Sequence, residues 1–156
     1  MRMIGSLIAI VISFAAGAIG SLATMSSIPT WYAALNKPPF NPPNWLFGPA
    51  WTILYIMMGI SSYLIWEKGW EKPEVKIALA LFAIQLILNS SWSVLFFGTH
   101  SLIRGFVCIV FLWFAILLTM IKFFALSSTA GWLLVPYILW VSFASILNYF
   151  IMVLNK

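Results

Sequence analysis

Five stretches of this chain are long and apolar enough to cross a membrane, and they leave little room for anything else. A spanning helix needs roughly 20 mostly apolar residues. Of the 156 residues, 63% are hydrophobic and only 7% are charged, whereas a soluble domain has about 25% charged residues. We therefore expect an all-α membrane protein, with a single transmembrane domain over residues 1–156 and helices over about 4–25, 46–66, 76–98, 102–123 and 131–154.

The connectors and the first stretch predict how these helices pack. The connectors near 98–101 and 124–130 are short, which favours antiparallel neighbours in an up-and-down bundle. In the first stretch small residues recur at every fourth position, which predicts a face where another helix approaches closely. That helix could belong to the same chain or to a second copy. The small residues are Gly5, Ala9, Ser13, Gly17 and Ser21.

The basic residues are scattered over helix ends and connectors. Scattered charge argues against nucleic acid as a partner and is typical of topology signals in a lipid bilayer. Five basic residues fall on one side of the membrane and three on the other. By the positive-inside rule the N-terminus is expected in the cytoplasm. The two groups are Arg2, Lys68, Lys72, Lys76 and Lys122, and Lys37, Arg104 and Lys156.

Several kinds of chemistry are missing from the sequence. No Asp, Glu, Lys or Arg lies deep in any of the five stretches, which disfavours ion-coupled transport. His100 is the only histidine and falls in a connector, where a surface position is expected. Cys108 is the only cysteine. We therefore predict no metal site, no cofactor and no hydrolytic triad.

Neutral polar and aromatic residues share faces on the third and fifth stretches. Gln85, Asn89, Trp92 and Phe96 lie on one face of a helix. A buried carboxamide needs a hydrogen-bond partner, so these amides either join helices or hold the polar edge of a ligand. On the fifth stretch Ala144 lies one turn beyond Trp140 and leaves space for a flat molecule. That face holds Pro136, Trp140, Phe143, Ala144, Leu147 and Asn148.

The connector between the first two stretches, a loop over residues 26–45, is rich in proline and aromatic residues. The segment WYAALNKPPFNPPNWLFGPAW, residues 31–51, holds three tryptophans and five of the eight prolines. Proline fixes the backbone and pushes the preceding residue away from helix. An interfacial belt explains the aromatics but leaves the prolines unexplained, whereas a preorganised lid over a cavity explains both. Trp51, Tyr55 and Met58 continue along one face below it.

Three ordered motifs carry a resemblance to a known family. They are WYxxLxKPPFxPPxWxFGPAWTxLYxxMG over 31–59, LFxxQLxLNxxWSxLFF over 81–97 and PYxxWxxFAxxLNxxI over 136–151. The chain resembles the translocator protein family, also called tryptophan-rich sensory proteins or peripheral benzodiazepine receptors. The resemblance covers essentially the whole chain and looks closest to bacterial members, which implies a bacterial cell membrane.

The resemblance implies a compact five-helix bundle, often a homodimer, whose lid caps a pocket. The implied ligands are porphyrins such as protoporphyrin IX or haem, and isoquinoline carboxamides. Tyr55 joins the implied site residues because it shares the face of Trp51. The others are Tyr32, Pro42, Pro43, Trp51, Asn89, Trp92, Cys108, Phe111, Trp140, Phe143, Ala144 and Leu147.

The predicted function is therefore a membrane receptor or scavenger of porphyrins. Some family members degrade protoporphyrin in light and oxygen, and the resemblance implies that Trp51 and Trp140 support this reaction. The alternatives are a facilitative porphyrin transporter and a regulatory membrane protein without catalysis. The proposed cholesterol motif allows one to five residues between its Tyr and its Lys or Arg. Six residues separate Tyr149 from Lys156, so cholesterol binding is not expected.

Overall fold

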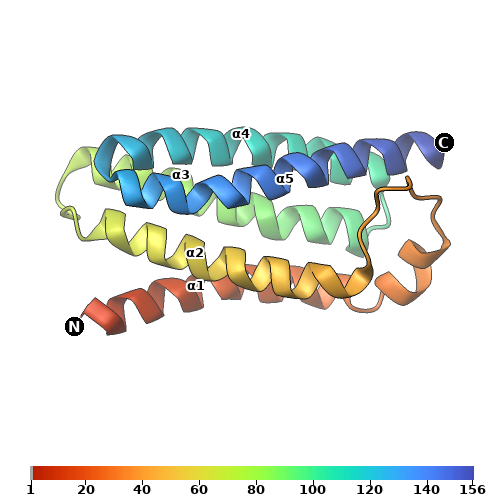
Figure 1. Ribbon diagram of the computed structural model, residues 1–156, viewed down its shortest axis with the longest axis horizontal. Helices are drawn as coiled ribbons and strands as arrows, with labels where there is room; N and C mark the ends of the chain where they lie inside the picture. The colour runs from red at the N-terminus through yellow and green to blue at the C-terminus, as the bar shows by residue number, and fades with distance from the viewer. Residues whose placement is uncertain (1) are drawn as a thin grey trace.

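The computed structural model describes residues 2–156, and within that range it forms an all-helical bundle. The five long helices run side by side and alternate in direction (Figure 1). Each is long and apolar enough to cross a membrane. The predicted up-and-down bundle is confirmed. The helices are α1 (Arg2–Thr24), α2 (Phe47–Trp66), α3 (Pro73–Ser93), α4 (Leu102–Leu126) and α5 (Ser128–Leu154).

The helices pack in a ring whose order differs from their order in the chain. The closest-packed pairs are α1 with α2, α2 with α5, α5 with α4, α4 with α3, and α3 with α1. The ring order is therefore α1, α2, α5, α4, α3. This order places α4 across the ring from the contact between α1 and α2.

The helix ends are set by local chemistry. Proline is tolerated in the first turn of a helix, and α3 begins at Pro73 after an extended Lys72, three residues earlier than expected. The break between α4 and α5 is shorter than expected, because only Ser127 separates them. Ser127 is extended and its hydroxyl accepts a hydrogen bond from the N–H of Ala130, which caps the new helix.

The end of α3 widens into a π-helical turn, Val94–Gly98. The N–H of Thr99 donates to the carbonyl of Val94 at 3.0 Å. Phe96 and Phe97 are both buried in this turn. π-Helical turns are frequent at functional sites, and this one brings two phenyl rings toward the interior of the ring of helices.

The small residues of α1 pack against α2 of the same chain. A Cβ atom at Gly5 would collide with the ring of Tyr63, and one at Gly17 with the ring of Tyr55. On the facing helix, a Cβ atom at Gly59 would collide with the backbone of Ile10. The predicted seam of close approach is therefore occupied within one chain.

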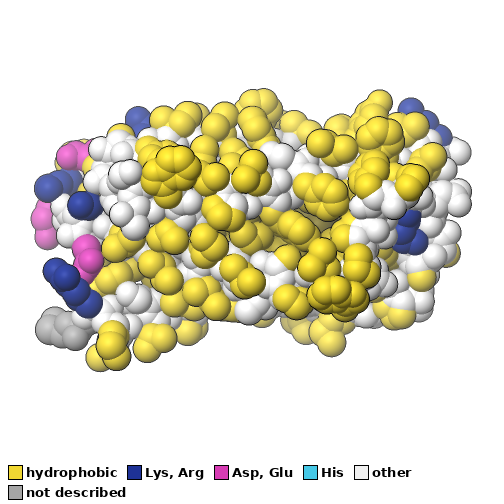
Figure 2. Space-filling model, viewed as in Figure 1, with side chains coloured by type: hydrophobic (Ala, Val, Ile, Leu, Met, Phe, Trp, Pro, Cys, Tyr) yellow, Lys and Arg dark blue, Asp and Glu magenta, His cyan; other side chains and the backbone are white. Residues whose placement is uncertain are grey.

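On the face that Figure 2 shows, charged side chains gather at the two ends of the bundle and hydrophobic side chains predominate between them. The end that carries Arg2 also carries Lys68, Lys72 and the acidic residues of the connector after α2. Arg2 and Glu67 form an ion pair of 3.3 Å there. The lid and the end of α5 lie at the opposite end (Figure 1). An apolar belt between two charged ends is the arrangement expected of a bundle that spans a bilayer.

Candidate ligand-binding site

A cavity of about 740 Å³ lies beneath the lid, between α1, α2, α5 and the π-helical end of α3. Ligand pockets usually have volumes of about 300–1,000 Å³ and mostly apolar walls with a few polar groups. Eight of the 24 lining residues are aromatic, and Phe47, Trp51 and Tyr55 on α2 are among them. Trp92 on α3 and the two phenyl rings of its π-helical end, Phe96 and Phe97, line the cavity as well. The cavity can therefore enclose a flat, apolar molecule.

Trp51 is the centre of the aromatic wall. Its indole stacks on the ring of Tyr55, with centroids 5.6 Å apart and planes 28° apart. It meets the rings of Tyr137 and Trp140 edge-on, at 6.2 and 6.5 Å. The Trp92 ring lies 6.4 Å away at 32°. Aromatic pairs at such distances stabilise one another, so the indole of Trp51 is held rigidly at the cavity.

A buried hydrogen-bond network holds this wall from behind. The hydroxyl of Tyr55 donates to Asn89 Oδ1 at 2.7 Å, and Asn89 Nδ2 donates to the hydroxyl of Tyr137 at 2.8 Å. The Tyr137 hydroxyl donates in turn to Gln85 Oε1 at 2.8 Å. The network joins α2, α3 and α5. For Gln85 and Asn89 these bonds favour the role of joining helices over the role of meeting a ligand.

Polar groups also reach the cavity from α5. Asn148 lines it, and its Oδ1 accepts a hydrogen bond of 3.2 Å from the indole N–H of Trp92. Its Nδ2 donates to the carbonyl of Ala144 at 2.8 Å. Asn148 therefore orients the Trp92 ring against the cavity.

The lid is fixed by its own side chains and by α5. Tyr32 is only 3% exposed, and its hydroxyl donates to Asn41 Oδ1 at 2.8 Å. Burial raises the pKa of the Tyr32 phenol to about 12. The Lys37 ammonium lies 4.9 Å above the Tyr32 ring. Phe40 packs edge-on against Phe150 of α5 at 5.5 Å, so the middle of the loop rests on the end of that helix.

The predicted site residues fall into four groups, and the first three lie at or beside the cavity. Six line the cavity, namely Tyr32, Trp51, Tyr55, Trp92, Ala144 and Leu147. Three lie behind this lining: Asn89 in the network, Trp140 against Trp51, and Phe143 against Trp140. Two are prolines of the lid, Pro42 and Pro43, which do not line the cavity but precede its short 3₁₀ turn, Asn44–Leu46.

Two predicted residues on α4 lie away from the cavity. Phe111 is 63% exposed on the outer surface, and Cys108 is buried with its thiol 3.6 Å from the carbonyl of Leu88. No residue of α4 is among those that line the cavity. The expectation that these two side chains would face the ligand space is not met, because α4 packs between α3 and α5, across the ring from α1.

The α1 wall was not predicted from the sequence. Phe14, Gly17 and Ser21 line the cavity, and the missing side chain of Gly17 leaves room for the Tyr55 ring. The small-residue pattern of α1 was the available signal, but it indicated helix packing alone.

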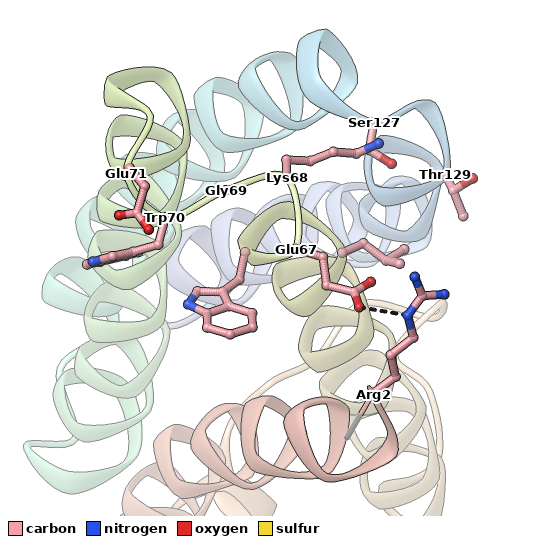
Figure 3. Close-up of a pocket in the computed structure, with 10 residues that line it drawn as sticks. Arg2, Glu67, Lys68, Gly69, Trp70, Glu71, Ser127 and Thr129 are labelled. Atoms are coloured by element: carbon pink, nitrogen blue, oxygen red, sulfur yellow. Dashed lines mark ion pairs between the residues drawn. The ribbon is translucent and has the colours of Figure 1, made fainter.

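A second hollow, of about 700 Å³, lies at the opposite end of the bundle. Figure 3 shows it between the start of α1, the connector after α2 and the start of α5. Arg2 and Glu67 pair within it, and the indoles of Trp66 and Trp70 are about half exposed. Four of the ten residues that line this hollow are charged, so the uncharged, aromatic cavity under the lid is the better candidate for a flat, apolar ligand. No three His, Cys, Asp or Glu residues in 2–156 gather where they could hold a metal ion.

Comparison with known proteins identifies the family. The sequence profile of the TspO/MBR family matches residues 9–154. The chain is 51% identical to the tryptophan-rich protein TspO of Chlorobaculum tepidum over 141 residues, which cover 90% of this chain and 89% of that protein.

Two further relatives, with lower identity, also align over most of the chain. The chain is 46% identical to the tryptophan-rich protein TspO of Archaeoglobus fulgidus over 156 residues, or 99% of this chain and 97% of that protein. It is 40% identical to the translocator protein of Bos taurus over 134 residues, or 85% and 79% of the two chains. With its five spanning helices, this chain is an integral membrane protein that belongs to the TspO/MBR family.

Proposed function

We propose that the protein is a membrane receptor and scavenger that binds porphyrins in the cavity beneath the lid. The observation that carries this proposal is the cavity of about 740 Å³ with Trp51 at the centre of an aromatic wall. A porphyrin is a flat aromatic macrocycle, and aromatic faces stack on one another. Isoquinoline carboxamides are also flat and would occupy the same space.

The contacts divide between lining and supporting residues. Aromatic side chains of the lining, with Trp51 in the centre, bear on the faces of the ligand, and Ala144 leaves the space into which its edge fits. Trp140 acts through Trp51, which it contacts, and Phe143 acts through Trp140, whose ring lies 5.8 Å away. Pro42 and Pro43 keep the lid stiff, which lowers the ordering cost of closing it.

Light-dependent degradation of the porphyrin is the proposed chemistry of this site. An excited porphyrin held against an electron-rich indole can exchange an electron with it in the presence of oxygen. Trp51 lines the cavity, whereas Trp140 contacts the Trp51 ring at 6.5 Å. Trp51 is therefore proposed as the reacting indole, with Trp140 in support.

The test is a titration of purified protein with protoporphyrin IX in the dark, followed by tryptophan quenching, and then illumination of the complex. Saturable quenching is expected in the wild type. Porphyrin loss in light should slow strongly in Trp51→Phe and less in Trp140→Phe. Trp132→Phe is the matched control, because Trp132 is 64% exposed on α5 and does not line the cavity. Absence of saturation would remove the receptor function. If Trp51→Phe loses porphyrin in light at the wild-type rate, the photochemical role of Trp51 is excluded, whereas the receptor function stands.

Facilitative transport is the second candidate. The cavity reaches the outer surface of α1, because Ala18 and Leu22 line it and are exposed. None of the described residues that line it is an Asp, Glu, Lys or Arg, so a coupled ion would find no charged partner. Porphyrin flux into protein-containing liposomes, compared with empty ones, tests this candidate. Equal flux in both would exclude it.

We also propose that the α1 start faces the cytoplasm of a bacterial cell. Five basic residues lie at that end and three at the lid end, as the positive-inside rule predicts. To test this, the native cysteine is removed by Cys108→Ala, and Lys37→Cys or Lys72→Cys is introduced as the single cysteine. Intact cells are then treated with a thiol reagent that does not cross the membrane. Labelling of Lys37→Cys alone is expected, and labelling of Lys72→Cys alone would reverse the orientation. The homodimer implied by the resemblance stays a prediction.

A further inference from the structure

A histidine outside the cavity holds the base of the lid. His100 lies in the connector between the π-helical end of α3 and α4. Its Nε2 is 3.1 Å from Ser27 Oγ, and its ring stacks on the Trp31 indole with centroids 4.7 Å apart and planes 13° apart. Ser27 is the N-cap of the lid's π-helical turn, Ile28–Tyr32, and Trp31 belongs to it. One side chain thus contacts both ends of the turn, which a plain surface role does not explain.

The directions of the hydrogen bonds follow from the partners of Ser27. Its Oγ lies 2.8 Å from the carbonyl oxygen of Phe97 and 3.3 Å from that of Ala23. Both carbonyls can only accept, and two oxygens 2.8 Å apart need a hydrogen between them, so the single hydroxyl hydrogen goes to the carbonyl of Phe97. His100 Nε2 must then donate to Ser27 Oγ. A second proton on the imidazole adds at Nδ1 and breaks none of these bonds.

A positive charge on the imidazole strengthens both of its contacts. Hydrogen bonds from cationic donors are stronger than neutral ones, and a cation within about 6 Å of an indole face is attracted to it. Histidine side chains in general gain this charge between about pH 5 and 8. His100 is exposed to solvent. Across the segments packed around it, residues 23–32, 94–98 and 101–105, the one charged side chain is Arg104.

The turn that His100 holds is also part of the cavity wall. The N–H of Tyr32 donates to the carbonyl of Ser27 at 2.8 Å, and the Tyr32 side chain lines the cavity. Trp31 meets the ring of Phe96 edge-on at 5.4 Å, and Phe96 lines the cavity as well. Movement of the Ser27–Trp31 segment therefore displaces two walls at once.

We propose that Ser27, Trp31 and His100 form a latch on the lid, in which His100 is the positioning residue and its protonation tightens the closed state. A ligand beneath the lid then leaves more slowly at low pH. The effect on ligand release rests on the proposed function, whereas the latch is a property of the empty protein as well.

The first experiment measures dissociation of protoporphyrin IX from the purified full-length protein at pH 5.5 and 8.5. The wild type should release it about two- to fivefold more slowly at pH 5.5. His100→Gln keeps an N–H donor but gains no charge. The ratio of its dissociation rate at pH 8.5 to that at pH 5.5 should therefore be about two- to fivefold smaller than in the wild type. The propionates of the ligand are the same in both experiments, so the difference in pH dependence between the wild type and His100→Gln reports on His100. Thr99→Ala, in the same connector, should keep the wild-type ratio. A His100→Gln ratio equal to that of the wild type overturns the proposal.

The second experiment needs no ligand. Hydrogen exchange of the Tyr32 amide, which bonds to the Ser27 carbonyl, is measured at pH 6 and 8 and corrected for intrinsic rates. Protection should be about two- to fivefold higher at pH 6 in the wild type and independent of pH in His100→Gln. If protoporphyrin fails to bind the wild type, the proposed function fails while this result still decides on the latch. If the ligand binds and protection is the same at both pH values, the latch fails and the function stands.

Discussion

Asn155 at the end of α5 binds the backbone of Asn36 in the lid through two hydrogen bonds. Its Oδ1 accepts from the N–H of Asn36 at 2.9 Å, and its Nδ2 donates to the carbonyl of Asn36 at 2.8 Å. The two residues are 119 positions apart in the chain. The amide thus pairs with both the N–H and the carbonyl of Asn36, in the way that a residue of an adjacent β-strand pairs with its neighbour. The last turn of the bundle therefore holds the middle of the lid in place.

Replacement of Asn155 should loosen the lid. Asn155→Ala removes both bonds, and a hydrogen bond contributes about 0.5–1.5 kcal/mol. Because the pair is exposed, we expect the lower part of that range, and a bound porphyrin should dissociate about two- to tenfold faster. Lys156→Ala is the control and should leave the dissociation rate unchanged. Equal rates for Asn155→Ala and the wild type would show that the clamp does not hold the lid closed.

The buried network behind Trp51 should contribute strongly to stability. Asn89→Leu leaves the hydroxyls of Tyr55 and Tyr137 without their amide partner. A buried polar group without a partner costs about 1–3 kcal/mol, so the midpoint of thermal unfolding in detergent should fall clearly. Ser91→Ala is matched on the same helix, because that hydroxyl bonds only to the carbonyl of Ile87 within its own helix. It should unfold like the wild type, and a similar drop in both variants would argue against the network.

The seam between α1 and α2 predicts different outcomes for substitution of two glycines of α2. Gly59→Ala places a methyl group against the backbone of Ile10, and overpacking of this kind costs about 1–3 kcal/mol. Gly48→Ala meets nothing within 4 Å, and a change that the backbone tolerates alters stability by less than about 1 kcal/mol. Thermal unfolding of the two variants, made in parallel, checks the difference. Equal losses would mean that the seam is not close-packed.

Alkaline pH should release the lid through Tyr32. Burial raises the pKa of this phenol to about 12, whereas a tyrosine in an unfolded or opened segment titrates near pH 10. Between these values the closed lid keeps a proton that the open lid releases, so the free energy of opening falls as pH rises. The full contribution of Tyr32 to the free energy of lid opening is present below about pH 10 and is lost as the pH rises toward 12. The difference in hydrogen exchange of the lid between wild type and Tyr32→Phe should therefore change between pH 10 and 12, and a constant difference would contradict this assignment.

The number and direction of the helices could be predicted because hydrophobic length is a local property. A stretch of spanning length without charge has few alternatives in a bilayer. The rigid loop between the first two helices could also be predicted from the sequence, because proline pairs restrict the backbone whatever surrounds them. The shared face of Asn89 and Trp92 follows from helical spacing, and both side chains point inward as that spacing requires.

The position of Phe111 could not be predicted in the same way. In a soluble helix polar residues mark the outer face, but in a membrane helix the lipid-facing and interior faces are both apolar. The sequence of α4 therefore does not show which of its rings face inward. His100 was missed for a different reason. Its partners, Ser27 and Trp31, lie about 70 residues earlier in the chain, and a lone histidine carries no spacing signal. Its backbone adopts a positive φ of 51°, which histidine tolerates more often than most residues.

The uncharged lining of the cavity determines how the site responds to membrane voltage. A transmembrane potential performs work of about 2.3 kcal/mol per elementary charge per 100 mV, and it acts only on charge that moves through the field. None of the described lining residues carries a formal charge, so an electrically neutral guest would enter or leave without sensing the potential. Any voltage dependence of occupancy would therefore measure the charge of the guest itself.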